Sequence, residues 1–190
     1  MSQRVPRTGR HFHAVQFYQD DESLVSIVSR FLADGFKQGQ PAVAITTPDH
    51  RIAIEDALTT YNVDVKRMKQ LGDLVLLDAR ETLETILADG MPHPRLFHHV
   101  LGSMFKEAAR IHPDRTTRAY GEMVNLLWKD GLTAAAIRLE TLWNELAQSH
   151  DFKLLCGYSM GNFYKDAAIG EITRHHTHVL ADTGEAATIN

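Results

Sequence analysis

Short apolar runs that alternate with amphipathic helical patterns constrain this chain to an α/β fold. Residues 12–18 form an apolar run typical of a buried parallel strand, and residues 23–36 carry apolar side chains at helical spacing. Four further strand-like runs follow at residues 41–46, 74–77, 116–121 and 152–157. Because strands that alternate with helices pair in parallel through crossover connections, the sequence predicts a mainly parallel central sheet flanked by helices.

Helical patterns occupy most of the stretches between these runs. Thr47 and Pro48 are residue types favoured at a helix start, so we expect Thr47 to cap the helix that follows. The segment 61–72 is polar and basic and is expected to be a connection, whereas residues 181–190 are expected to fray. The remaining helices are expected at residues 48–61, 81–88, 95–111, 122–129, 132–148 and 170–176.

The composition is that of a one-domain protein. The 190 residues, 44% of them hydrophobic, suffice for one core, which we expect over residues 11–180 between flexible ends at 1–10 and 181–190. A net charge of −4 gives no reason to expect direct nucleic-acid binding. The single cysteine excludes an intramolecular disulfide, and no apolar run resembles a signal-peptide core or a membrane span. We therefore expect a cytoplasmic protein that does not contact a membrane.

The loop after the first strand argues against a nucleotide hydrolase. It reads Gln19-Asp20-Asp21-Glu22, where nucleotide-binding α/β domains carry glycines and a lysine. Three carboxylates would repel a triphosphate, and no Lys or Ser/Thr stands where it would hold phosphate and magnesium. Capping of the first helix by Asp20 or Asp21 is the simpler explanation of this acidic loop.

Five segments, taken in their order along the chain, resemble one known family. The segments are His13–Tyr18, Gly35–Gly39, Tyr120–Met123, Leu139–Leu146 and Leu154–Tyr158. Together they resemble the MEDS domain, the methanogen/methylotroph and dichloromethane-regulator sensory domain, over about residues 11–180. The resemblance implies a three-layer RecA/KaiC-like fold with a degraded phosphate loop. It also implies sensing of small hydrocarbon derivatives and association with histidine kinases, DNA-binding regulators or other signalling modules.

Four side chains are predicted to meet at the carboxyl edge of the sheet, where open α/β proteins place their ligands. They are Tyr18, Tyr120, Glu122 and Tyr158, each at or just after the end of a predicted strand. Glu122 could accept a hydrogen bond from a ligand there, or it could form a structural ion pair with Arg118. Packed aromatic side chains are the structural alternative for the tyrosines.

Glu140 and Trp143 lie in the helical pattern of residues 132–148 and are further candidates for ligand binding. Glu140 flanks the apolar stripe and could point toward Arg118 or Arg138, although charged residues beside such a stripe are usually solvated. Trp143 could close a small-molecule pocket, or it could be ordinary core. Arg118, Glu140 and Trp143 complete the set of predicted ligand-binding residues.

The sequence predicts no catalytic residue, metal or cofactor. The histidines at 98–99 and 175–178 are adjacent or nearly so, and neighbouring side chains on a helix point in different directions, so we interpret their clustering as chance. His13 is expected at the opposite end of the first strand from Tyr18 and in hydrogen-bonded packing. Cys156 is expected to be a buried thiol that behaves as a small hydrophobe. Ser159 lacks the glycine pattern of a hydrolase nucleophile.

These features favour a non-enzymatic signalling sensor that binds a small organic ligand or a protein partner. We expect its output to pass to a separate histidine kinase or transcriptional regulator. One alternative is a divergent nucleotide-binding ATPase that uses Glu122 and Glu140 as acidic groups. Another is a structural interaction module with a filled sheet edge and an exposed apolar helix face. A homodimer is the expected assembly.

Overall fold

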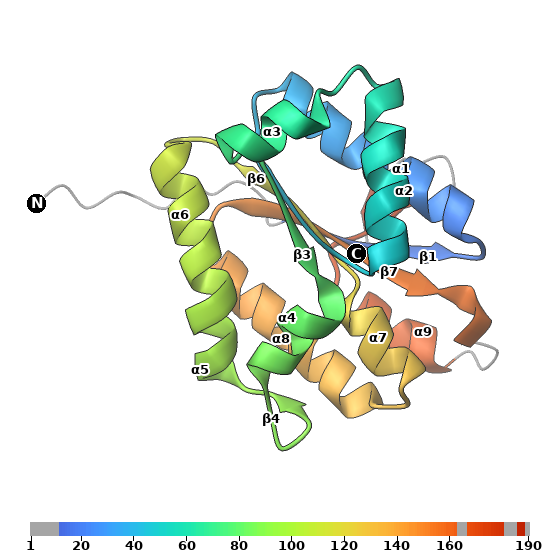
Figure 1. The fold of residues 1–190 in the computed structure, drawn as a ribbon. Coiled ribbons are helices and arrows are strands. Elements are labelled where there is room, and N and C mark those ends of the chain that lie inside the picture. Colours follow the sequence, from blue (N-terminus) through green and yellow to red (C-terminus); the bar gives the residue numbers. More distant parts are fainter. Residues whose placement is uncertain (1–11, 163–166, 181–185, 189–190) are drawn as a thin grey trace, which may run out of the picture.

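A seven-stranded sheet runs through the computed structural model, which describes residues 12–162, 167–180 and 186–188 (Figure 1). The order of its strands is β3-β2-β6-β7-β1-β8-β9. All neighbouring pairs are parallel except β8 and β9, which confirms the predicted mainly parallel sheet. Its strands are β1 (Phe12–Tyr18), β2 (Ala42–Thr46), β3 (Leu74–Asp78), β6 (Thr117–Gly121), β7 (Phe152–Ser159), β8 (His178–Leu180) and β9 (Ala186–Thr188).

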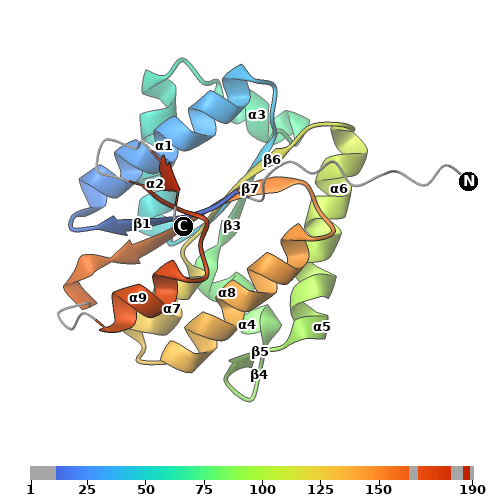
Figure 2. The same cartoon turned by 180° about the vertical axis from the view of Figure 1, so that it is seen from behind.

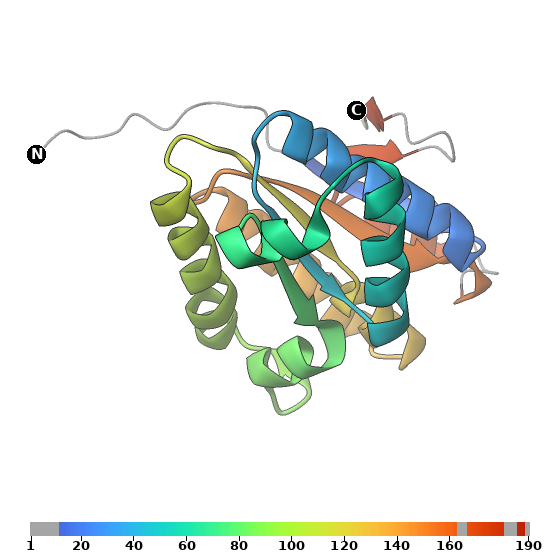
Figure 3. The ribbon, with the colours of Figure 1, turned by 45° about the horizontal axis from the view of Figure 1, so that its top comes forward.

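Helices cover both faces of the sheet, so the fold has three layers (Figures 1 and 2). One face carries α1 (Asp21–Lys37), α2 (Pro48–Thr60) and α3 (Val65–Leu71). Figure 3 shows α1 and α2 next to each other on this face. The helices on the other face are α4 (Ala79–Ile86), α5 (Pro94–Phe97), α6 (Ser103–Ile111), α7 (Met123–Lys129), α8 (Thr133–Ala147) and α9 (Ala167–Thr173).

Each face of the sheet has its own apolar core, because successive residues of a buried strand point to opposite faces. On β1, Ala14 packs with α1 and α2, whereas Val15 packs with α7 and α8. The helix α8 contributes a continuous buried stripe to the second core, as its helical spacing predicts. The two cores hold β1, β2, β6 and β7 as a nearly fully buried centre of the sheet.

Several expected elements differ in the structure. The stretch expected as a connection at 61–72 contains α3, a seven-residue helix whose start is capped by Asp64, which accepts from the Arg67 amide. Helix α2 begins at Pro48, but the expected cap by the Thr47 side chain is absent, and the Thr47 amide donates to Glu122. Residues 186–188 form β9 within the stretch expected to fray.

The helix expected over residues 95–111 is continuous in direction but not uniform. It begins as α5, passes through a π-helical segment at His98–Gly102 and continues as α6. Between α4 and α5, β4 (Leu87–Ala88) and β5 (Met91–Pro92) form a short antiparallel hairpin. Residues 1–10, expected to be a flexible end, lie outside the described residues.

Within the described ranges, no helix combines the length and apolar character needed to cross a bilayer.

Candidate functional site

The start of α1, directly after β1, is capped by a side chain of the loop that joins them. Asp20 is the N-cap of α1, and its carboxylate accepts a 2.8 Å hydrogen bond from the Ser23 amide. Asp21 and Glu22 occupy the first helical turn. Amides at a helix start are the groups that bind phosphate in nucleotide-binding domains. Here an aspartate takes one of them, and three negative charges surround the position, which confirms the expected cap by Asp20.

Glu122 lies at the carboxyl edge of the sheet, where its buried carboxylate contacts three protein groups. Its Oε1 accepts from the Tyr120 hydroxyl at 3.0 Å and lies 2.9 Å from Nδ1 of His50. Its Oε2 accepts from the Thr47 amide at 3.0 Å. The ion pair with Arg118 that the sequence suggested is wrong, because His50 takes that place.

The side chain of Asn125 links Tyr18 to the same edge of the sheet. Asn125 donates its Nδ2 to the Tyr18 hydroxyl at 3.1 Å and accepts from the Ser159 amide at 3.1 Å. The Tyr18 ring also meets His50 edge-on. We call Tyr18, His50, Tyr120, Glu122 and Asn125 the sheet-edge network. It connects the carboxyl ends of β1, β6 and β7 with the starts of α2 and α7.

His50 is the part of the sheet-edge network nearest to solvent. Its Nε2 lies 3.2 Å from Oδ1 of Asp21, whose side chain is 76% exposed, whereas the His50 side chain is 12% exposed. The hydrogen bond to Glu122 raises the pKa of His50 above its ordinary value of 6.5, although burial alone would lower it. Burial, reinforced by the Glu122 charge, raises the pKa of both Tyr18 and Tyr120, so these phenols remain protonated.

We expect the contribution of His50 to stability to fall with rising pH. The folded-state pKa is raised, so the stabilisation is complete below the unfolded value of about 6.5 and is lost as pH rises through the folded value. Urea unfolding of the wild-type protein and of His50→Gln should therefore differ most at pH 6 and least at pH 9. A difference that is the same at both pH values would show that the imidazolium form does not stabilise the network.

A second polar cluster is buried on the other face of the sheet, between β1, β7, α8 and the turn that follows α9. Nε2 of His13 lies 3.2 Å from Oε2 of Glu140 and 3.4 Å from Sγ of Cys156. Nε2 of His176 lies 3.5 Å from Oε1 of Glu140. We call His13, Glu140, Cys156 and His176 the buried cluster. Tyr158 donates its hydroxyl to Oε1 of Glu140 at 2.7 Å.

Charge in the buried cluster is concentrated on Glu140. Burial alone would raise the pKa of Glu140, but the two histidines and the Tyr158 hydroxyl outweigh it and hold that pKa at about 2. Burial lowers the pKa of His176 to about 4. Burial and the Glu140 charge raise the pKa of Cys156, so its thiol is protonated and a poor nucleophile in this state.

The predicted ligand-binding residues are therefore divided among different places. Tyr18, Tyr120 and Glu122 meet in the sheet-edge network, as expected. Tyr158 does not join them, because its side chain points to the opposite face and bonds Glu140. Glu140 is buried and does not point toward Arg118 or Arg138; the latter pairs with Glu145.

Arg118 and Trp143 lie apart from both polar groups. Arg118 donates to the Gln40 side chain at 2.8 Å and stacks on the Phe31 ring, near the amino end of β6. It lines a hollow of about 370 Å³ together with Asp34. Trp143 is buried among aromatic rings, with Phe97 perpendicular to it at 5.1 Å between centroids. The structural alternative of ordinary core is the one the structure shows for Trp143.

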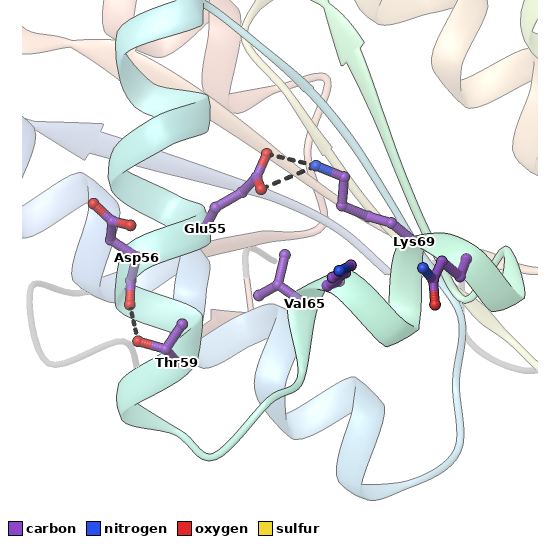
Figure 4. A pocket seen from close by; sticks show the side chains of 7 residues that line it. Glu55, Asp56, Thr59, Val65 and Lys69 are labelled. Carbon is purple, nitrogen blue, oxygen red and sulfur yellow. Dashed lines mark hydrogen bonds and ion pairs between the residues drawn. The ribbon is translucent and has the colours of Figure 1, made fainter.

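Another hollow, of about 410 Å³, lies on the surface between α2 and α3 (Figure 4). Glu55 and Lys69 form an ion pair across it, with 3.0 Å between Nζ and Oε2 (Figure 4). The Thr59 hydroxyl donates to the Asp56 carbonyl at its side. Glu55, Lys69 and the Thr59 hydroxyl thus already bind protein groups.

Sequence reasoning missed His50, Asn125 and His176 as partners of the predicted residues. His50 and Asn125 stand near the starts of helices that follow strands, which is a position that faces the carboxyl edge. Glu140 carried a clearer signal. It lies four residues after Ala136 and three before Trp143, inside the apolar stripe, and a charged residue there requires a buried partner.

Comparisons with known proteins agree with this architecture. The family model described as MEthanogen/methylotroph, DcmR Sensory domain (MEDS) matches residues 12–177. An uncharacterized protein from Pyrococcus horikoshii, solved in complex with an unknown peptide, superposes with a TM-score of 0.63 at 15% identity, covering 95% of this chain and 84% of that one. A KaiC-like protein from Pyrococcus horikoshii OT3 superposes with a TM-score of 0.59 at 10% identity, covering 88% and 70%.

At these identities the two solved structures show a shared fold alone, and that fold is KaiC-like, as the sequence resemblance implied. No curated protein matches the sequence. The family model spans both the sheet-edge network and the buried cluster, from the first strand to the residue after His176. The chain therefore belongs to the MEDS family of sensory domains.

Proposed function

We propose that the protein is a non-enzymatic signalling sensor whose sheet-edge network responds to a small organic ligand and whose output acts on a histidine kinase or a transcriptional regulator. Membership of a sensory-domain family supports the signalling role. The observation that carries the non-enzymatic part is the state of Glu122. Both of its oxygens already accept hydrogen bonds from protein groups, which supports a structural role for Glu122 rather than one in holding magnesium or activating water.

The ligand in this proposal binds at the contact between His50 and Asp21. It is the most exposed link of the network, and Asp21 is the first residue of α1. A ligand with a hydrogen-bond acceptor oxygen replaces Asp21 on Nε2 of His50. The first turn of α1 then loses a contact to α2, which changes the surface that a partner protein meets. The ligand thus shifts the population between two arrangements of the same fold.

We expect no magnesium-dependent binding of ATP. The Asp20 cap and the acidic first turn repel phosphate, and the chain has no lysine in the loop. Native mass spectrometry of the tag-free protein with ATP and magnesium should show no ATP adduct. A stoichiometric ATP adduct that is lost in Glu122→Gln, but retained in Glu145→Gln at an exposed position, would restore the ATPase alternative.

The ligand itself is sought by the same method and by thermal shift. Protein purified without a tag is sprayed under native conditions to detect a co-purified small organic mass. Short-chain alcohols, aldehydes and carboxylates, each of which carries an acceptor oxygen, are then screened for a rise in melting temperature. A hit that disappears in His50→Gln and persists in His112→Gln supports the proposal, since His112 pairs with Asp73 elsewhere. A hit that is unchanged in His50→Gln places the sensor site away from the sheet-edge network.

A further inference from the structure

The four side chains of the buried cluster have the spacing of a metal coordination sphere. All four ligand atoms lie within 4.8 Å of one another. With bonds of about 2.0–2.3 Å to nitrogen, oxygen and sulfur, a tetrahedral ion places its ligand atoms roughly 3.3–3.6 Å apart. The cluster has 3.2 Å from His13 to Glu140, 3.4 Å from His13 to Cys156 and 3.5 Å from His176 to Glu140. Small shifts of side chains suffice to complete the sphere.

Hydrogen bonds outside the cluster orient both imidazole rings for coordination. Nδ1 of His176 lies 2.8 Å from the Ile172 carbonyl oxygen, which can only accept, so this nitrogen carries the proton. Asn144 donates its Nδ2 to the His175 carbonyl, which turns its Oδ1 toward Nδ1 of His13 at 2.9 Å. Nδ1 of His13 therefore donates as well. In the neutral rings both Nε2 atoms keep their lone pairs, and both face the cluster.

The Nε2 lone pairs of His13 and His176 face the Glu140 carboxylate, and this arrangement is unfavourable unless a positive charge lies between them. Nε2 of His176 is buried and has no hydrogen-bond partner in the part of the chain that the structure describes, although it faces Oε1 of Glu140. Burial of such an acceptor beside a carboxylate is unfavourable. A divalent cation removes the conflict. Its two charges equal those of the Glu140 carboxylate and a Cys156 thiolate, so the buried site becomes neutral.

We propose that His13, Glu140, Cys156 and His176 bind one divalent transition-metal ion, with zinc as the best match to the ligand set. Two imidazoles, one thiolate and one carboxylate are a zinc donor set, and four protein ligands make a closed site of the structural type. On binding, the Cys156 thiol releases its proton to solvent. The Tyr158 hydroxyl, which donates to Oε1 of Glu140, leaves Oε2 directed at His13 and Cys156.

The competing explanation is a metal-free ion pair in which a proton on Nε2 of His13 bonds Glu140. Both explanations use His13 and Glu140, but only the metal site uses the sulfur of Cys156 and the lone pair of His176. Cys156 and His176 are therefore the residues that distinguish them. Cys156 and His176 lie outside the sheet-edge network, so the test of the metal site is independent of the test of the ligand proposed above.

The test is metal content and cobalt spectroscopy of the full chain, purified without a polyhistidine tag. Elemental analysis should find a single zinc ion per chain. After removal by chelation and addition of Co²⁺, a thiolate-to-cobalt charge-transfer band and tetrahedral d–d bands should appear. Cys156→Ser changes one buried atom, and it should remove the charge-transfer band. Circular dichroism confirms that each variant is folded.

Histidine variants provide the matched comparison. His176→Gln should weaken zinc binding at least about 100-fold, since loss of an outer-shell partner alone costs 10–100-fold. His99→Gln, at an exposed position of the π-helical segment, should leave it unchanged. Folded wild-type protein that lacks metal and gives no cobalt band would overturn the proposal. Equal zinc affinity in wild type, Cys156→Ser and His176→Gln would do the same, because binding would then lie elsewhere.

Discussion

Replacement of Glu140 by alanine is expected to lower the free energy of unfolding by about 3–5 kcal/mol, even in protein kept metal-free with a chelator. The Glu140 side chain is fully buried and faces two histidines, and it accepts from Tyr158. Its removal leaves the Tyr158 hydroxyl without its acceptor, and the two histidine rings without the carboxylate they face, in a place that water does not reach. Urea unfolding followed by circular dichroism measures the loss.

A matched control lies on the same helix. Glu145→Ala removes a carboxylate from a partly exposed pair with Arg138, whose side chains are 42% and 35% exposed. Such pairs contribute at most about 1 kcal/mol, so this variant should unfold close to the wild-type midpoint. If Glu140→Ala and Glu145→Ala cost the same, the buried cluster contributes no more than a surface ion pair. That result would remove the energetic basis for treating it as a constructed site.

The second large effect is expected at Trp143. Trp143→Ala should cost about 3–5 kcal/mol, because it removes a buried aromatic side chain and leaves a cavity. The indole is packed by Phe97, Phe105 and Phe152, with ring centroids 5.1, 6.3 and 6.0 Å away. These contacts fix α8 against β7 and the helix α6. Chemical denaturation of the variant, with an unchanged slope of free energy against urea, would show a simple loss of stability.

Leu132 supplies the control for this exchange. It precedes α8 and is 44% exposed, so Leu132→Ala should change the free energy of unfolding by about 0.5 kcal/mol or less. A small effect at Trp143 would mean that its ring faces a cavity able to collapse or fill with a ligand. That result would favour the alternative stated from the sequence, in which Trp143 closes a small-molecule pocket.

The architecture could be predicted from the sequence because its signals are local. The apolar run at residues 12–18 and the stripe of α8 each reveal their structure within one element. Helix α3 was missed for the same reason, since only Val65 of its seven residues is buried and the apolar pattern is too weak to read. Its start depends on one capping side chain, Asp64, which a polar segment does not make conspicuous.

The site was only partly predictable because its contacts are distant in sequence. Tyr18 and Glu122 could be placed at one edge because both follow strand ends. The contact between His13 and Asn144 joins residues separated by 131 positions, and no local spacing indicates it. The other contacts depend on which face of the sheet each strand residue points to. Tyr158 and Cys156 are two residues apart and so point to the same face, which is opposite to the face where Tyr18 and Tyr120 pack.

The place of β1 in the sheet has a consequence for the order in which the protein can fold. In the described chain β1 pairs with β7 and β8, strands that begin at Phe152 and His178, and Thr177 donates its amide to the His13 carbonyl at 2.7 Å. β1 therefore gains its neighbours in the sheet only after the last part of the domain has been synthesised. Such long-range pairing slows folding and leaves an apolar strand exposed during synthesis. A nascent chain stalled before residue 150 should accordingly remain dependent on chaperones, whatever the stability of the finished domain.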